Sequence, residues 1–181
     1  EPDRTSDQHQ PCYLDQQWQW DGVTFRLLSP DKNSAAKGNN ASCVLLIESP
    51  HGRALLLGDA ERTVEKRLAP ELSRVAPIDI VIAGHHGSAS SSSTELIEAV
   101  NAKEAWFSAG YLNRYQFPKK DVLARWELAK VRRYRTDLEG TLQYTFEARP
   151  SQTSTYWETA RKPWHNSVSP LAPSEHAVSS V

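Results

Sequence analysis

Short apolar runs that alternate with amphipathic segments most limit the folds open to this chain. Across residues 18–27, large apolar residues alternate on both sides of Asp21-Gly22, and an Asp-Gly pair in such a setting is a strong hairpin signal. Two further apolar runs, residues 43–47 and 54–57, flank a Ser-Pro-His-Gly turn. Their shortness and the turn between them predict a second hairpin.

Helices and strands alternate after the second hairpin. Residues 61–72 have apolar side chains at a spacing of four and predict a helix, and residues 78–83 predict a buried strand. Ser92 and Glu95 fit a capping box that would begin a second helix. A strand at 105–109, a loop at 110–118 and a helix at 119–130 follow, the last with core candidates Val122, Leu123, Trp126 and Leu128. Segments 131–135 and 141–146 predict a final hairpin. This order predicts an α/β fold in which strands and helices share one core.

The composition is that of one globular domain. The chain has 181 residues, of which 39% are hydrophobic and 24% are charged. Its formal charge of −1 excludes a function that depends only on a polybasic or strongly acidic chain. We expect a linker at residues 1–17, a folded unit at 18–148, and a disordered tail at 149–181, where Ser, Thr and Pro predominate. Because the chain lacks Met and opens at Glu1, we expect it to be a piece of a longer protein. We expect it to have neither a leader nor a membrane-spanning run.

Two cysteines are too few for a disulfide scaffold or a cysteine zinc site. Cys12 and Cys43 would pair if the domain faced an oxidising compartment such as the periplasm. Each is equally explained as a small apolar residue.

The residues most suggestive of chemistry follow predicted strands. Asp59 comes after one strand and His85-His86 after another, and ligands bind outside strand ends in open α/β sheets. Carboxylate and imidazole groups are ligands for Zn²⁺ or Mn²⁺. Asp59 is also explained as a turn residue, and the sequence leaves open which histidine is a ligand and which contacts substrate. Ser88 and the serines at 90–93 offer hydroxyls and backbone amides to an anion such as phosphate.

Residues 114–135 contain eight basic residues against two acidic ones. Aromatic residues are interleaved with this stretch or lie just before it: Tyr111, Tyr115, Phe117, Trp126 and Tyr134. The pattern fits phosphate contacts combined with stacking on single-stranded nucleic acid. The alternative is that the charges cover solvated helix and strand faces, with Trp126 and Tyr134 in the core.

Several motifs together resemble the metallo-β-lactamase-like domain of the ComEC competence proteins, over residues 11–147. They are Trp18-Gln-Trp20-Asp21-Gly22, Leu56-Leu57-Gly58-Asp59, Gly84-His85-His86-Gly87-Ser88, Ser108-Ala109-Gly110-Tyr111-Leu112-Asn113-Arg114 and Tyr134-Arg135-Thr136-Asp137. The resemblance implies the C-terminal half of an αββα sandwich, within a polytopic bacterial inner-membrane protein that takes up DNA. It further implies a soluble, periplasm-facing domain that acts as a metal-dependent nuclease on the strand that is not imported.

By the same resemblance, Asp59 is the carboxylate shared by two Zn or Mn ions, and His85 or His86 is a further metal ligand. The remaining histidine, with Ser88, would contact phosphate of single-stranded or double-stranded DNA, and no organic cofactor is implied. The chain departs from the family twice. No H-x-H-x-D-H cluster precedes the tryptophan hairpin, so the fragment is expected to be inactive alone, and Phe117 stands where many relatives carry histidine. The alternatives are a non-catalytic DNA-binding or channel-associated module with a degenerate metal site, and a hydrolase of another phosphoester or ester.

Overall fold

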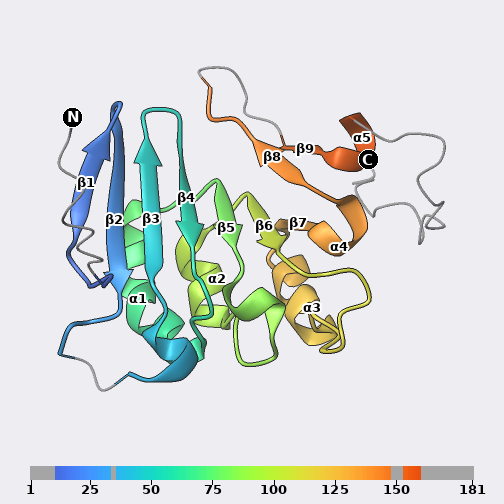
Figure 1. Ribbon diagram of the computed structural model, residues 1–181, viewed down its shortest axis with the longest axis horizontal. Helices are drawn as coiled ribbons and strands as arrows, with labels where there is room; N and C mark the ends of the chain where they lie inside the picture. The colour runs from blue at the N-terminus through green and yellow to red at the C-terminus, as the bar shows by residue number, and fades with distance from the viewer. Residues whose placement is uncertain (1–10, 34–35, 148–152, 160–181) are drawn as a thin grey trace, which may run out of the picture.

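The computed structural model describes residues 11–33, 36–147 and 153–159 (Figure 1). The strands are β1 Gln17–Trp20, β2 Val23–Ser29, β3 Val44–Ser49, β4 Gly52–Leu56, β5 Ile80–Ile82, β6 Glu104–Phe107, β7 Arg132–Arg135, β8 Leu142–Tyr144 and β9 Thr153–Thr155. The helices are α1 Arg62–Val75, α2 Thr94–Val100, α3 Lys120–Leu128, α4 Thr136–Glu139 and α5 Tyr156–Thr159, with 3₁₀ turns η1 Gly38–Ala41 and η2 Gly84–Gly87. Among the described residues, no helix is both long and apolar enough to cross a membrane.

Seven strands form one sheet in the order of the sequence, β1 to β7. The first four are antiparallel neighbours, which confirms both predicted hairpins, and β4 to β7 are parallel to one another. Trp18 lies opposite Phe25 in the first hairpin, and their rings stack with centroids 5.2 Å apart. The change from antiparallel to parallel pairing comes where helical segments begin to separate the strands, as parallel neighbours require.

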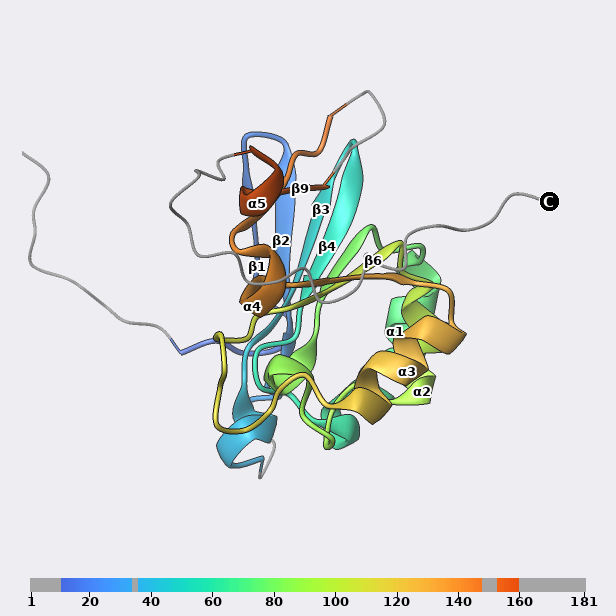
Figure 2. The ribbon, with the colours of Figure 1, turned by 90° about the vertical axis from the view of Figure 1, so that its right-hand side faces the viewer.

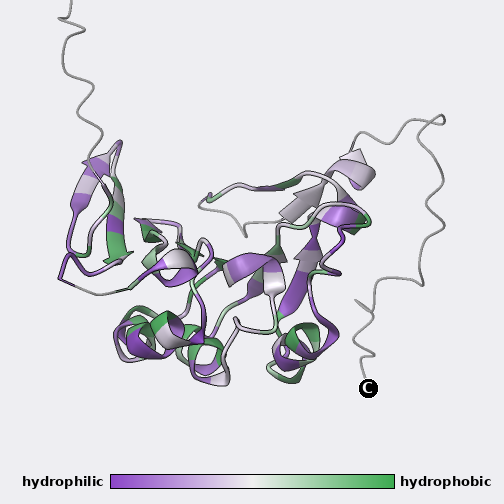
Figure 3. Ribbon diagram, turned by 60° about the horizontal axis from the view of Figure 1, so that its bottom comes forward, coloured by the Kyte–Doolittle hydropathy of each residue, from purple (hydrophilic) through white to green (hydrophobic). Residues whose placement is uncertain are grey.

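Helices α1, α2 and α3 cover one face of the sheet (Figure 2). The core between them is apolar: Leu46, Leu55, Val81 and Phe107 of the sheet belong to one buried cluster with Trp126 of α3. Each of these helices carries both hydrophobic and hydrophilic stripes (Figure 3), as an amphipathic helix lying on a sheet should. One sheet with helices on one face is what the C-terminal half of an αββα sandwich should contain, so the predicted fold class is confirmed.

The predicted final hairpin is wrong. Strand β7 pairs in parallel with β6, and β8 pairs with β9 in a separate two-stranded sheet. The segment read as the hairpin turn forms α4 instead, where the Glu139 carboxylate accepts the backbone N–H of Arg135. Because β7 follows helix α3, it extends the parallel sheet by another crossover and cannot also lie beside β8 through a tight turn.

The prediction of a disordered tail at 149–181 is wrong for residues 153–159, which form β9 and α5; its remainder lies outside the described residues. The buried carboxylate of Glu104 on β6 anchors this segment. It accepts a hydrogen bond from the Thr153 hydroxyl, accepts another from Trp106 Nε1 at 3.0 Å, and pairs with Arg132 at 2.8 Å. Strand β9 and helices α4 and α5 therefore lie on the face opposite α1–α3 (Figure 2).

Two local expectations about helices also need correction. Leu128 is 83% exposed and does not join the core, because it stands at the last position of α3, whereas Val122 and Trp126 are buried as predicted. Helix α2 is capped by Ser93, whose Oγ accepts the N–H of Leu96 at 3.3 Å, one residue later than the predicted capping box.

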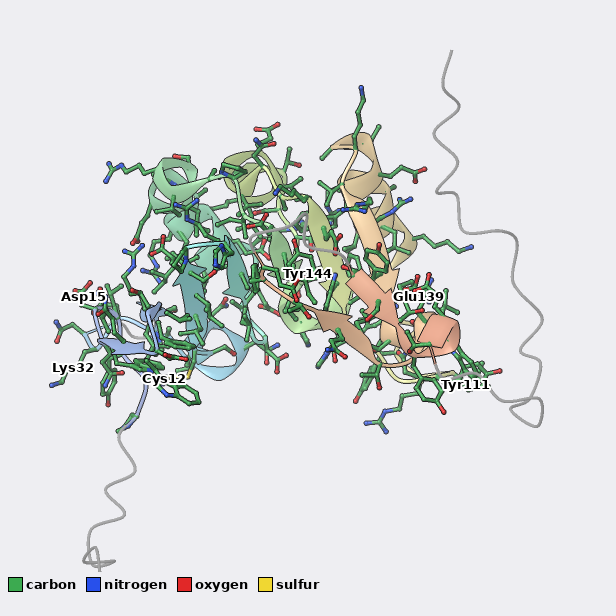
Figure 4. The ribbon with its side chains drawn as sticks, turned by 90° about the horizontal axis from the view of Figure 1, so that it is seen from above. Cys12, Asp15, Lys32, Tyr111, Glu139 and Tyr144 are labelled. Atoms are coloured by element: carbon green, nitrogen blue, oxygen red, sulfur yellow. A yellow bond between two sulfur atoms is a disulfide. The ribbon has the colours of Figure 1, made fainter. Side chains whose placement is uncertain are left out.

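Cys12 and Cys43 form a disulfide. Of the two alternatives that the sequence left open, a disulfide pair or two small apolar residues, the structure has the pair. The bond fixes the segment before β1 to the start of β3, and Figure 4 shows Cys12 at the end of the molecule farthest from Tyr111.

Removing this disulfide is expected to lower the free energy of unfolding by about 4 kcal/mol, because closing a loop of 31 residues removes entropy from the unfolded chain. Urea denaturation of a Cys12→Ser/Cys43→Ser variant measures the loss. A reductant should destabilise the native chain by a similar amount and leave the double variant unchanged. Equal stability of both proteins would contradict the expectation.

Candidate functional site

Parallel pairing of β4, β5 and β6 brings the candidate residues to one edge of the sheet. Asp59 follows β4, the two histidines follow β5, and Ser108 follows β6. The carboxyl ends of parallel strands meet at the same edge, where open α/β sheets bind ligands. The structure thus brings together the loops that the sequence singled out.

Asp59 and His86 face each other across this edge. Asp59 Oδ1 lies 3.6 Å from His86 Nε2, and about half of each side chain is exposed. His86 Nδ1 lies 2.8 Å from the carbonyl oxygen of Ser108, which can only accept, so Nδ1 carries a proton and Nε2 is the ring nitrogen on the Asp59 side. The backbone N–H of Asp59 donates to Ser42 Oγ at 3.2 Å, which holds its loop.

The turn that carries the histidines has an unusual backbone. His85 and His86 have φ values of 46° and 55°, in the left-handed region that residues other than glycine rarely adopt. Gly87 continues the turn with φ of 81°, and a Cβ there would lie 2.5 Å from Pro118 Cβ, so only glycine fits. Strained backbone of this kind persists where the surrounding structure enforces it, often at functional sites. Here it sends the two imidazole rings in different directions, with 61° between their planes.

His85 belongs to a separate polar network. Its Nδ1 lies 3.3 Å from Glu61 Oε1, which also accepts from Ser90 Oγ at 2.7 Å and from Asn39 Nδ2 at 3.3 Å. Ser88 Oγ joins the network through Ser90 Oγ at 3.1 Å. The Ser90 hydroxyl and then Asn39, with a smaller contribution from His85, hold the pKa of the Glu61 carboxyl below its ordinary value. Glu61 is therefore ionised throughout the neutral pH range.

Two backbone amides of the serine run, those of Ser92 and Ser93, are not free for the predicted anion site. Both carboxylate oxygens of Glu65, on α1, accept backbone N–H groups at 2.7 Å, one from Ser92 and one from Ser93. The Arg125 side chain donates to the carbonyls of Ser91 and Ser92 from the other side. The amides are thus already bound by a carboxylate inside the protein. Burial raises the pKa of Glu65 above its ordinary value, and the two backbone hydrogen bonds oppose that shift.

The structure therefore divides the predicted site residues into two groups. Asp59 and His86 form a pair, while His85 and Ser88 lie in the network of Glu61. Within the parts of the chain that are described, no group of three or more His, Cys, Asp or Glu side chains could hold a metal ion. Glu61 was missed, although a carboxylate two residues after Asp59 was a usable signal. The sequence carried no signal for Asn39, because only the fold brings this residue beside His85.

The chain is similar to parts of several curated proteins. It is 32% identical to the uncharacterized protein YcaI of Escherichia coli over 158 residues, which are 87% of this chain and 21% of that protein. It is 35% identical to competence protein ComA of Neisseria gonorrhoeae, over 72% of this chain and 19% of ComA. It is 36% identical to ComE operon protein 3 of Bacillus subtilis, over 74% of this chain and 17% of that protein. No protein-family profile matches the chain.

The fold and the sheet edge define an α/β domain that presents a carboxylate and an imidazole at the ends of parallel strands. The sequence similarity is more specific and makes the chain ComEC-like: most of its length is similar to a segment of competence protein ComA and to a segment of ComE operon protein 3. It spans about a fifth of the length of the curated relatives it matches.

Two solved structures are also similar in fold. One is a CmlA β-hydroxylase E377D mutant, with a TM-score of 0.47 and 10% identity, covering 78% of this chain and 32% of that one. The other is a putative Zn-dependent hydrolase of the metallo-β-lactamase superfamily from Thermotoga maritima, with a TM-score of 0.43 and 15% identity, covering 68% of this chain and 69% of that one.

The buried Glu65 carboxyl should give stability a definite pH dependence. The pKa of Glu65 in the folded chain lies above its ordinary value of 4.5. At a pH between the unfolded and the folded pKa, the folded chain therefore keeps a proton that the unfolded chain has lost. The free energy of unfolding therefore falls as pH rises through that interval. Glu65→Gln should flatten this slope, measured by denaturation at several pH values.

Glu65→Ala should cost about 1–3 kcal/mol, because the buried N–H groups of Ser92 and Ser93 lose their acceptor. Glu98→Gln, at an exposed position of α2, is the matched control and should change neither the slope nor the stability. An unaltered slope in Glu65→Gln would contradict the assignment.

Proposed function

We propose that this chain is the C-terminal part of the lactamase-like domain of a DNA-uptake protein, and that the full-length protein hydrolyses DNA phosphodiesters with divalent metal ions. The observation that carries the proposal is the Asp59–His86 pair at the open sheet edge, 3.6 Å apart. The competence names of two relatives support the DNA context.

The two side chains fit a divalent ion in their chemistry. A carboxylate oxygen and an imidazole nitrogen are ligands for Zn²⁺ and Mn²⁺. The Ser108 carbonyl accepts the Nδ1 proton of His86 and so orients Nε2 toward Asp59, as a backbone carbonyl commonly orients a metal-binding histidine. Since each ion needs more protein ligands than one such pair supplies, the proposal requires further ligands from the full-length protein. Bound ions would supply Lewis-acid stabilisation of charge on the phosphodiester oxygens.

His85 and Ser88 have a different part in this proposal. Glu61 holds His85 by its Nδ1, and the same carboxylate is linked through Ser90 to the Ser88 hydroxyl. When protonated, His85 can donate to Glu61 and to a phosphate oxygen at the same time. We assign His85 and Ser88 to holding phosphate and His86 to the metal.

The disulfide supports a location for the domain. Disulfides persist in oxidising compartments and are rare in the cytosol. The Cys12–Cys43 bond thus favours a domain of an inner-membrane protein that faces the periplasm.

A non-catalytic DNA-binding module is the second candidate, and one contact favours it. The Phe117 ring lies against His85, with centroids 5.7 Å apart, where the family resemblance leads us to expect a histidine. An apolar ring there cannot bind a metal or move a proton.

Asp59→Ala and His86→Ala should each lower metal-dependent DNA cleavage by the full-length protein about 100-fold or more, because each removes a metal ligand. Cleavage of labelled DNA in Mn²⁺ or Zn²⁺ measures activity, and calorimetric titration measures metal binding. His51→Ala is the matched control, since His51 is an exposed histidine in the β3–β4 turn, at the opposite edge of the sheet.

Undiminished cleavage in both variants would overturn the metal assignment. Salt-dependent DNA binding without metal-dependent turnover in the native protein would support the non-catalytic module instead.

A further inference from the structure

The loop at residues 110–118, here called the aromatic loop, is fixed to the histidine turn near both of its ends. Just before the loop, the Ser108 carbonyl contacts His86 Nδ1, and just after it the Lys119 N–H donates to the Gly87 carbonyl at 2.9 Å. Phe117, inside the loop, contacts His85. The aromatic loop therefore borders the sheet edge that carries Asp59 and His86.

Its side chains form a stack that is open to solvent. The rings of Tyr115 and Phe117 stack with centroids 5.5 Å apart and 20° between their planes. The Arg114 guanidinium lies 4.7 Å from the centre of the Tyr115 ring, and Lys119 Nζ lies 5.5 Å from that of Phe117. Tyr115 is 54% exposed, and Tyr111 is 60% exposed. Exposed rings paired with cations are unusual for a surface that only faces water, because apolar area is left unburied.

The positive charge predicted for residues 114–135 is concentrated at the same place. Half of the eight basic side chains are neutralised by acidic partners, namely Arg125, Arg132, Arg133 and Arg135. Within the described ranges, no ion pair involves the other four, of which Arg114, Lys119 and Lys120 lie in the aromatic loop or directly after it and Lys130 follows α3. Trp126, which the sequence offered as a stacking residue, is fully buried. Three of the four basic residues without an ion pair are thus found at the aromatic loop.

We propose that the aromatic loop binds single-stranded nucleic acid, with unpaired bases stacking on Tyr111 and Tyr115 and phosphates contacting Arg114, Lys119 and Lys120. Aromatic platforms flanked by basic side chains hold single strands in this way, without sequence preference. A duplex keeps its base faces covered, so it can use only the cations. This inference rests on the proposed function, since it places one strand beside the residues assigned to cleavage.

The test measures binding alone, with metal removed by EDTA, so that it does not depend on cleavage. Fluorescence anisotropy of the full chain with a labelled oligo(dT) of about 12 nucleotides gives the affinity, and an abasic strand of equal length reports phosphate contacts only. Tyr111→Ala/Tyr115→Ala should weaken oligo(dT) binding about 10-fold or more and leave abasic binding within about twofold. Tyr115→Phe, which keeps the ring, should bind like the native chain.

Trp20→Ala is the matched control, because Trp20 is a 74% exposed aromatic residue on β1, at the far end of the sheet (Figure 1). It should bind oligo(dT) normally. Unchanged oligo(dT) affinity in the double tyrosine variant, an equal loss for both strands, or native binding to duplex as tight as to oligo(dT) would overturn the proposal. Stacking-dependent binding combined with no metal-dependent cleavage would instead count against the proposed function and leave this inference standing.

Discussion

Parallel pairing of β4, β5 and β6 is the constraint on which the rest of this structure depends. Each strand runs in the same direction, so the residues that follow them gather at one edge: Asp59, the histidine turn and Ser108. The left-handed backbone at His85 and His86 is held there from two sides, by the loop of Asp59 and by the segment after β6. Without this pairing, the three loops would have no common position.

Two buried carboxylates hold the outlying segments to that sheet. Glu65 binds the backbone of the serine run that connects the histidine turn to α2, and Glu104 binds Thr153 of β9. Both oxygens of Glu65 accept backbone N–H groups, whereas Glu104 accepts two hydrogen bonds at Oε2 and pairs with Arg132 through Oε1. Such partners lower the cost of burying a carboxylate. Glu65 fixes the segment that follows the histidine turn. Glu104 fixes β9, which lies on the face of the sheet opposite the helices.

The sheet edge brings two groups of side chains into a small area. Asp59 and His86, a carboxylate and an imidazole, are the residues proposed to hold a cation, while the aromatic loop proposed to bind a single strand carries flat rings and positive charge. Because Phe117 touches His85, a change in the aromatic loop can also move the network of Glu61. A single nucleic-acid strand bound to the aromatic loop would then bring a phosphate toward His85 and Ser88, the residues proposed to hold it.

The sequence alone determined the elements with strong local signals: the first two hairpins and the helices α1, α2 and α3. It also singled out Asp59 and the two histidines, which the structure places at one edge of the sheet. Local periodicity and turn residues specify such elements because the interactions involved span only a few positions. Tertiary structure decided the rest. It chose His86 over His85 as the partner of Asp59, gave the serine amides to Glu65, and paired β8 with β9. Each of these depends on contacts between residues far apart in the chain, such as Glu65 with Ser92, for which no pattern within a short window carries information.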